Sequence, residues 1–221
     1  MTAHILYSKI DKDNVYFLPQ SNKNSLSTAL PQFSDGVKSF EFKVEFKPDF
    51  SKSKPNENYG IMMLNGKHLG ISWLESENGQ SNIVGSLWTE NELQQVFSPL
   101  TNYYGKRTED YTYAHFIVDI ENGTMQLNNT AEKKAFVSKK INGKLSNDYA
   151  FSYLWIGCGN NFENCDDEFR WNFYGDISYA EVIIDGKTIF KSRCEKRTKY
   201  KVYDESENGN HLIKYSSEWF G

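Results

Sequence analysis

The sequence contains little proline, little cysteine and no long apolar run. Five prolines among 221 residues argue against a disordered chain. No stretch reaches the roughly 18 apolar residues that a membrane-spanning helix requires, so we expect no membrane partner. The three cysteines are an odd number, and the opening MTAHILYSKIDKDN lacks the basic start and apolar run of a secretory signal. We therefore expect reduced thiols and no signal peptide.

Charge of one sign is not concentrated in any long block either. The chain has 25 Lys and Arg against 29 Asp and Glu, a net charge of -4. Nucleic-acid binding depends on clustered basic side chains, so we expect no nucleic-acid partner. The most basic stretch, KSRCEKRTKYK at 191–201, is typical of a solvated β ribbon. A patch for an anionic glycan, a nucleic acid or a partner chain is the alternative there.

Strict alternation of apolar and polar residues is the main pattern that the sequence does have. In SFEFKVEFKP, Phe40, Phe42, Val44 and Phe46 occupy one face, and charged residues occupy the other. A period of two residues predicts a strand with one buried and one solvated face. Similar segments follow at 59–64, 67–74, 81–89, 111–120, 124–129, 133–141, 150–159, 169–186 and 187–192.

Turn residues separate these segments, and helical signals are scarce. Asn65-Gly66 is a strong hairpin signal, and ENG at 121, NGK at 142 and DGK at 185 mark further turns. The segment TENELQQVF at 89–97 combines a Thr cap with a Glu three residues later. That pattern predicts one or two helical turns.

The number and spacing of the strands predict the architecture. Ten or more short strands joined by tight turns predict an all-β fold, a two-sheet antiparallel sandwich of the jelly-roll type. No change of composition marks a second domain before residue 192. We therefore assign 1–192 to one sandwich. Residues 193–221 are either a C-terminal extension or closing strands.

The order of the segments resembles laminin-G-like and concanavalin A-like lectin/glucanase modules. The strand SFEFKVEFKPDF leads into YGIMMLNGKHLGISW, then AHFIVDIENGTMQLNNT, and finally SYLWIGCGNNFENCDDEFRWNFYGDISYAEVIIDG. The F-x-G-x-I strand of these modules matches Phe173, Gly175 and Ile177, and Ile183 follows. The resemblance implies a concanavalin A-like sandwich of the phage structural or bacterial glycan-binding type. This fold hosts lectins, hydrolases, lyases and structural modules, so it implies no single function.

The stretch YDESENGNH at 203–211 belongs to the same resemblance. Related modules often carry D-x-S-G-N-G-N-H, and here Glu207 stands where the family usually has Gly. The stretch also lies near the C-terminal end of this sequence, whereas in many relatives it precedes the sandwich. It therefore either closes this domain or is a vestige of a following one.

Two segments are candidates for calcium. Asp204, Ser206 and Asn208 have the spacing of the first half of a calcium loop, but Tyr215 occupies the twelfth position, where a bidentate Glu is needed. A turn held by side-chain hydrogen bonds is the favoured interpretation. Asp166 and Asp167 in ENCDDEF form the second candidate, for which a solvated acidic loop is the alternative. We expect no required cofactor, with calcium as the one candidate ion.

The sequence lacks the carboxylate pattern that glycoside hydrolysis requires. Glycoside hydrolysis needs two carboxylates across the sugar, and glucanases of this fold carry an E-x-D-x-E or E-x-D-x-x-E strand. The nearest match is Asp119 with Glu121, two acids at a strand end without a third. We therefore predict that the chain is not an enzyme, and a glycoside hydrolase or lyase is the disfavoured third function.

Aromatic residues, 15% of the chain, suggest how a ligand is held. Sugar rings pack on Trp or Tyr and form hydrogen bonds with polar groups around them. In YLWI, Trp155 alternates with Leu154 and Ile156, and one of these two faces must be core. For every ring, packing in the interior is the alternative to ligand binding. The candidate glycan-binding residues are Trp171, Tyr103, Tyr104, Asn102, Arg107 and Trp88.

These observations predict a non-enzymatic binding module whose ligand is a glycan, used for recognition or adhesion. The alternative is a structural or decoration protein of a tailed-phage virion, in the capsid, neck or tail fibre. The expected partner is a glycan or another protein chain of an assembly, and an oligomer fits the second alternative. Without a signal peptide, we expect a virion or a surface display by a non-classical route, and otherwise the cytoplasm.

Overall fold

The computed structural model describes eleven segments of the chain: 8–10, 15–17, 26–29, 36–64, 69–100, 111–129, 137–145, 153–157, 173–193, 197–198 and 201–214. They contain the strands β1 to β17 and one short 3-10 turn, η1 (Phe50–Lys52). The all-β prediction is therefore confirmed for these residues. No helix within the described segments is long and apolar enough to cross a membrane.

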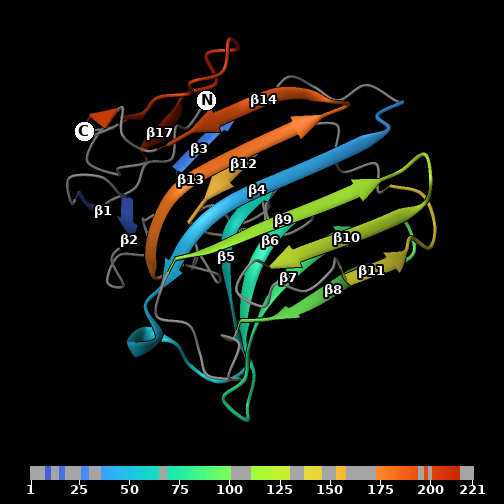
Figure 1. Cartoon of the computed structure of the whole chain (residues 1–221), viewed down its shortest axis with the longest axis horizontal. Helices are drawn as coiled ribbons and strands as arrows, with labels where there is room; N and C mark the ends of the chain where they lie inside the picture. Colours follow the sequence, from blue (N-terminus) through green and yellow to red (C-terminus); the bar gives the residue numbers. More distant parts are fainter. Residues whose placement is uncertain are drawn as a thin grey trace.

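The strands form two antiparallel sheets. The first has the order β1-β2-β13-β4-β9-β10-β11, with β14 also paired to β13. It lies in front in Figure 1. Its strands are β1 (Ser8–Ile10), β2 (Val15–Phe17), β4 (Ser39–Pro48), β9 (Thr112–Asp119), β10 (Thr124–Asn129), β11 (Val137–Lys140), β13 (Gly175–Ile184) and β14 (Lys187–Ser192).

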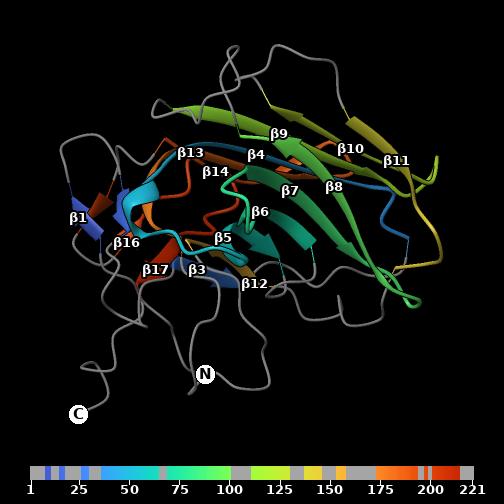
Figure 2. The ribbon, with the colours of Figure 1, turned by 90° about the horizontal axis from the view of Figure 1, so that it is seen from below.

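The second sheet has the order β15-β16-β17-β3-β12-β5-β6-β7-β8. Seen from below, the two sheets form separate layers, as expected for a sandwich (Figure 2). The strands of the second sheet are β3 (Leu26–Ala29), β5 (Glu57–Leu64), β6 (Leu69–Glu75), β7 (Ser81–Trp88), β8 (Leu93–Pro99), β12 (Tyr153–Ile156), β15 (Arg197–Thr198), β16 (Lys201–Val202) and β17 (Leu212–Lys214).

The core lies between the sheets and follows the predicted alternation. Along β4, the four alternate apolar residues from Phe40 to Phe46 are buried, and Glu41, Lys43 and Glu45 face outward. Phe42 stacks on Phe116 of β9, with ring centroids 6.2 Å apart. Each such buried side chain contributes about 1.5–3 kcal/mol to stability. The same core therefore holds both sheets together.

Two glycines allow close approaches that a side chain would prevent. A Cβ on Gly85 of β7 would lie 2.4 Å from the Phe116 ring across the core. Gly175 has φ +142, and a Cβ there would lie 2.1 Å from the Lys47 carbonyl oxygen. The F-x-G-x-I motif is thus explained by packing, because Phe173 and Ile177 on either side of Gly175 are buried.

The segment 89–97 corrects one prediction, because it forms no helix. Residues Leu93–Pro99 form β8, which pairs with β7 in register. The Thr89 hydroxyl instead holds a tight turn, accepting a hydrogen bond from the Glu92 amide and donating to its carbonyl. Pairing with β7 and burial of alternate β8 side chains outweigh the local cap signal, as tertiary context often does.

Side-chain hydrogen bonds connect the neighbouring edges of the two sheets. Gln94 of β8 donates from Nε2 to the Asn142 carbonyl and accepts from the Asn142 amide at 2.9 Å. Asn129 of β10 donates to the Pro99 carbonyl at 2.7 Å. Strand β8 accordingly packs beside β10 and β11 (Figure 1).

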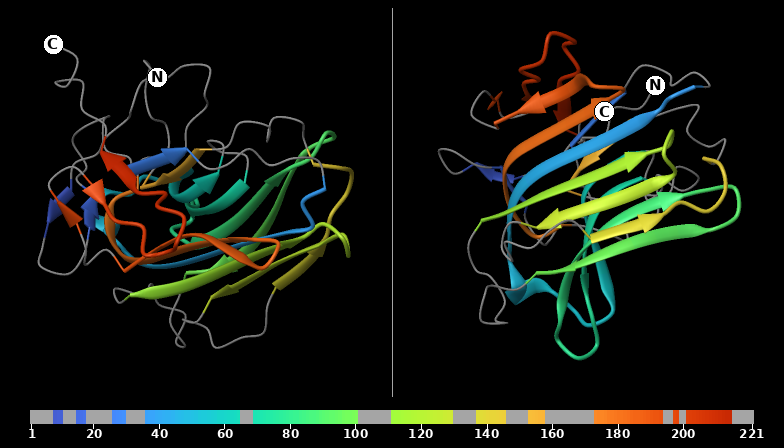
Figure 3. Two further views of the ribbon diagram at one scale, coloured as in Figure 1. Left: turned by 90° about the horizontal axis from the view of Figure 1, so that it is seen from above. Right: turned by 45° about the vertical axis from the view of Figure 1, so that its right-hand side comes forward.

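The C-terminal strands belong to the second sheet. Strand β17 pairs with β3 on one side and with β16 on the other. Val202 and Leu212 are part of the core. Residues 203–211 leave the sheet between these two strands and contact β14 of the first sheet. In Figure 3 this red segment runs beside the orange β14.

Candidate functional site

Residues 203–211, which we call the capping segment, form a turn organised by Asp204. Asp204 is only 7% exposed. Its Oδ1 accepts hydrogen bonds from the amides of Lys191 (3.0 Å) and Ser206 (2.8 Å). Its Oδ2 accepts from the Ser206 hydroxyl (2.6 Å) and the Asn210 amide (2.8 Å). The carboxylate therefore satisfies four donors of the fold.

The capping segment also covers the outer edge of β14. Asn208 Nδ2 donates to the Thr188 carbonyl at 2.7 Å, and Asn210 Nδ2 donates to the Ile189 carbonyl at 2.8 Å. The Glu205 amide donates to the Lys191 carbonyl at 2.7 Å. Backbone groups at the edge of a sheet otherwise offer a template for another strand. The regular spacing of polar residues in this segment thus has a structural use.

Calcium at the capping segment stays a prediction. A calcium ion takes six to eight oxygen ligands, and both Asp204 oxygens already accept protein hydrogen bonds. Among the residues described, no group of three or more His, Cys, Asp and Glu side chains is arranged to hold a metal. Asp166 and Asp167 lie outside the described segments.

Titratable residues gather on the outer face of the first sheet. Glu181 of β13 accepts hydrogen bonds from the Tyr179 hydroxyl (2.9 Å) and lies 3.2 Å from Lys43 Nζ and 3.8 Å from Lys191 Nζ. Burial acts to raise the pKa of Glu181, but these hydrogen bonds and charges outweigh it and lower the pKa. The carboxylate is therefore held ionised by its neighbours.

His115 of β9 belongs to the same face. Its Nε2 lies 2.9 Å from a carboxylate oxygen of Glu41 on β4. Burial lowers the pKa of His115 by more than the hydrogen bond and charge of Glu41 raise it. Interlocked ion pairs of this kind are common in structural networks as well as in active sites. Every carboxylate named here already has a cationic or hydrogen-bonding partner.

The outer face of the second sheet has a different chemistry along β7 and β8. Because Gly85 of β7 faces Phe116 across the core, its neighbours Val84 and Ser86 point to the outside. Their partners on β8 are Phe97 and Gln95, which lie directly opposite and share that face. The residues that point to this side, which we call the β7–β8 surface, are Asn82, Val84, Ser86, Trp88, Leu93, Gln95, Phe97 and Pro99. Val84 and Ser86 are buried, whereas the other six are partly or fully exposed.

Aromatic and amide groups alternate on the β7–β8 surface. The Phe97 side chain is 43% exposed, and Trp88 is partly exposed. Between them, Gln95 Nε2 donates a hydrogen bond to the Ser86 hydroxyl at 3.3 Å. Rings beside amide and hydroxyl groups are the combination that binds small polar molecules with apolar faces.

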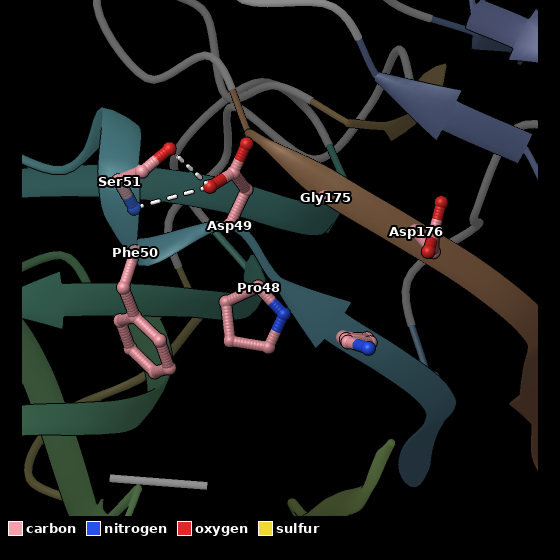
Figure 4. A pocket seen from close by; sticks show the side chains of 7 residues that line it. Pro48, Asp49, Phe50, Ser51, Gly175 and Asp176 are labelled. Atoms are coloured by element: carbon pink, nitrogen blue, oxygen red, sulfur yellow. Dashed lines mark hydrogen bonds between the residues drawn. The ribbon is translucent and has the colours of Figure 1, made fainter. Parts of the chain in front are cut away.

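A pocket of about 420 Å³ lies where β4 ends and β13 begins (Figure 4). Asp49 Oδ1 accepts hydrogen bonds from the amide (3.1 Å) and the hydroxyl (2.6 Å) of Ser51, so this carboxylate caps η1. Of the two acidic residues that line the pocket, Asp49 therefore serves the local turn. The lining residues are Lys47, Pro48, Asp49, Phe50, Ser51, Gly175 and Asp176.

The structure places only part of the predicted site. Trp88 lies on the β7–β8 surface. In β12, Leu154 and Ile156 belong to the core, as expected of one of its two faces, and Trp155 on the other face is buried outside that core. The other predicted ligand residues, Trp171, Tyr103, Tyr104, Asn102 and Arg107, lie outside the described segments.

Sequence reasoning missed Phe97 and Gln95, because it assigned their segment to a helix. Alternation with a period of two over 93–99 would have predicted the strand, since Gln94, Val96 and Ser98 are its buried members.

The two carboxylates considered for glycoside hydrolysis already have partners in the protein. Asp119 accepts hydrogen bonds from the Asn122 amide and side chain, and Glu121 forms an ion pair with Lys38 at 3.0 Å.

No protein-family model matches the sequence, and no curated protein matches it. Solved structures do match, at 11% to 13% identity. The heptameric SAP-like pentraxin of Limulus polyphemus is 13% identical with a TM-score of 0.52, covering 81% of this chain and 73% of the pentraxin. A Bacteroides ovatus protein, named as a candidate carbohydrate-binding protein, is 12% identical with a TM-score of 0.54 over 86% of this chain and 57% of its own.

Mouse laminin α1 domains LG4-5 are 11% identical to this chain, with a TM-score of 0.52 over 92% of this chain and 52% of theirs. The chain thus spans little more than half of the laminin and Bacteroides chains. At such identities the likeness is one of fold. The chain has the concanavalin A-like fold, which confirms the resemblance seen in the sequence.

Proposed function

We propose that this chain is a non-enzymatic carbohydrate-binding module and that it holds its glycan on the β7–β8 surface. One observation carries the proposal: two aromatic rings, Trp88 and Phe97, flank the partly exposed amide of Gln95, which a hydrogen bond to the buried Ser86 hydroxyl holds in place. The fold is one that carbohydrate-binding proteins use, which supports the proposal without deciding it.

The physical basis is the two-sided character of a sugar. Its ring carbons present an apolar face that packs on an aromatic side chain, and its hydroxyls form hydrogen bonds with amides. Both kinds of group are present here at fixed register, since β7 and β8 are paired along their full length. A site on rigid strands loses little conformational entropy when the ligand binds.

The carboxylates of the described residues support binding rather than hydrolysis. Glycosidases place two of them about 5 to 9.5 Å apart on either side of the bond to be cleaved. Glu75, at the end of β6, is buried and accepts a hydrogen bond from the Ser81 hydroxyl at 2.7 Å. Glu41 and Glu181 are paired on the opposite sheet.

A glycan array probed with the whole chain, with calcium and again with EDTA, tests this function. We expect array binding that Phe97→Ala abolishes and Tyr111→Ala preserves. Tyr111 is the matched control, because its side chain is 38% exposed beside β9 of the first sheet. Loss of binding with EDTA would instead implicate an ion at the calcium candidates.

A second control addresses the pocket beside β4. Asp176→Asn removes the charge of a lining residue there and leaves the β7–β8 surface intact. Loss of glycan binding in Asp176→Asn but not in Phe97→Ala would move the site to the pocket. A blank array would contradict the proposal and favour a structural role, for which a stable oligomer or a partner chain should then be sought.

A further inference from the structure

We infer that the ligand of the β7–β8 surface is an extended, uncharged oligosaccharide that lies along these two strands and contacts both Trp88 and Phe97. The inference rests on the proposed function and adds to it the ligand's length, direction and charge. It follows from the spacing of the two rings and from the chemistry of the residues around them.

The spacing of the Trp88 and Phe97 rings indicates the length of the ligand. Phe97 lies opposite Val84, and Trp88 lies four residues beyond Val84 on β7. At a rise of about 3.4 Å per residue, the two rings are separated by about 14 Å along the strands. A single sugar ring cannot reach across that distance, whereas a chain of several sugars can.

The groups between the two rings indicate the direction in which the ligand lies on the strands. Ser86 and Gln95 are opposite one another midway between Val84 and Trp88, and they are joined by a hydrogen bond of 3.3 Å. Ser86 is buried, so Gln95 is the member of this pair that a ligand can reach. A ligand that follows the strands meets an aromatic ring, then the Gln95 amide, then a second ring. A ligand that crosses the strands meets only one of these groups on β7 and β8.

The residue types of the β7–β8 surface indicate that the ligand is uncharged. All eight outward residues of β7 and β8 are uncharged, from Asn82 to Pro99. The accessible hydrogen-bonding side chains are the amides of Asn82 and Gln95, which are suited to the hydroxyls of neutral sugars. An anionic sugar placed here would give up hydration without gaining a cation from this surface, which is unfavourable.

The outer face of the first sheet shows what a charged surface of this molecule looks like. Lys43 and Lys191 are present there, but both lie within 3.8 Å of the Glu181 carboxylate. An anionic ligand on that face would have to compete with Glu181 for them. The two faces therefore differ in the class of ligand that each could accept, and the second sheet favours the neutral class.

Isothermal titration calorimetry with oligosaccharides of graded length tests the inference. The probes are neutral cello-, malto- and manno-oligosaccharides from monosaccharide to hexasaccharide, with oligogalacturonides and sialyllactose as anionic counterparts. For the series that binds, we expect affinity to rise at least about tenfold from disaccharide to hexasaccharide and to change little with added salt. We expect no binding of the anionic probes.

Variants test whether one ligand touches both rings. Phe97→Ala and Trp88→Ala should each weaken hexasaccharide binding by roughly tenfold or more. Removal of either ring should also abolish the dependence on chain length. Trp88→Phe keeps a ring and serves as the second variant, because Trp88 is partly buried and its truncation alone could disturb the fold. Tyr111→Ala, with its exposed ring elsewhere, should bind as the parent does.

The outcomes separate this inference from the proposed function. Equal affinity for a monosaccharide and a hexasaccharide would overturn the extended ligand, and salt-sensitive binding of the anionic probes alone would overturn its neutrality. Either result would leave a carbohydrate-binding module in place. Binding of no carbohydrate at all would overturn the proposed function, and this inference with it.

Discussion

The two outer faces of the sandwich differ far more than the two inner ones. Inside, both sheets contribute the same kinds of apolar side chain to one core. Outside, the first sheet presents a network in which Glu41, Lys43, His115 and Glu181 are bonded to one another or to neighbours. The second sheet presents rings and amides along β7 and β8. The fold therefore does not determine the surface, and function must be sought in the outward residues.

The difference also separates two uses of polar residues. On the first sheet, and at its β14 edge, polar groups mainly satisfy other groups of the protein, as Asp204 does. On the β7–β8 surface, the Gln95 amide is partly exposed beside the Phe97 ring and donates one hydrogen bond to the buried Ser86 hydroxyl. Groups of the first kind contribute to stability, whereas groups of the second kind are suited to a ligand. Measurements of stability and of binding should therefore respond to different substitutions.

The largest expected effect concerns the core that both faces share. Gly85→Val would place side-chain atoms where the Phe116 ring now lies, 2.4 Å from the position of a Cβ. We expect a loss of about 3 kcal/mol in the free energy of unfolding, at the upper end for overpacked cores. Urea denaturation measures it. Asn82→Ala, a partly exposed outward residue of the same strand, is the control and should change stability by less than about 0.5 kcal/mol.

The second effect tests whether the capping segment stabilises the first sheet. Asp204→Ala removes the acceptor of four hydrogen bonds, including that of the Lys191 amide. We expect the free energy of unfolding, measured by urea denaturation, to fall by about 2–3 kcal/mol, because buried donors are left without an acceptor. Asp204→Asn keeps one acceptor oxygen and should lose less. Glu207→Ala, exposed in the same segment, is the control. Unchanged stability in Asp204→Ala would mean that the segment only rests on β14.

The third effect concerns the charged network on the first sheet. Glu181→Gln keeps the shape of the side chain but removes the carboxylate that Lys43 and Lys191 share, so that Lys43 keeps only its contact with Glu41. We expect the free energy of unfolding at neutral pH to fall by about 1–2 kcal/mol, as measured by urea denaturation. The folded-state pKa of Glu181 is lower than its ordinary value of 4.5. Its contribution is therefore complete above pH 4.5 and disappears as the pH falls through the folded pKa.

The difference between the parent chain and Glu181→Gln should accordingly shrink in acid. Glu45→Gln on β4 of the same face is the control for a general loss of negative charge. An equal effect of the two substitutions at every pH would show that net charge, and not the contact with Lys43, is responsible.

The fold could be predicted from the sequence because the alternation of apolar and polar residues marks the strands and the turn residues mark their ends. The apolar residues of SFEFKVEFKP are buried as predicted. Asp185-Gly186 forms the predicted turn with positive φ at both residues, as hairpins of type I′ require. Asp185 Oδ1 also accepts hydrogen bonds from the amides of Lys38 and Ser39. That last contact joins residues far apart in the sequence, and no local pattern predicts it.

The site was less predictable, because an outward position depends on register between strands. Trp88 was chosen for its residue type alone, and only pairing with Leu93 shows which face it occupies. Phe97 sits in a segment whose cap signal favoured a helix, and only the pairing of β8 with β7 resolves it as a strand. In YLWI, alternation shows that one face is core but not which one; the structure assigns Leu154 and Ile156 to it, and Trp155 is buried on the other face.

The smallest expected effect concerns His115, whose neighbours on the outer face are Tyr113, Glu41, Lys43 and Glu181. Its folded-state pKa lies below the ordinary 6.5, first because of burial. Between these two values the unfolded chain binds more protons than the folded one, so stability decreases as the pH falls below 6.5. We expect the decrease from this residue to stay below about 1 kcal/mol.

NMR titration of the imidazole measures the pKa directly, and urea denaturation at pH 7 and at lower pH measures its consequence. His115→Gln should flatten the decrease, because an amide can replace the contact with Glu41 and does not titrate in this range. If His115→Gln left the slope unchanged, the acid sensitivity would not come from this imidazole, and the contact between His115 and Glu41 would have no part in it.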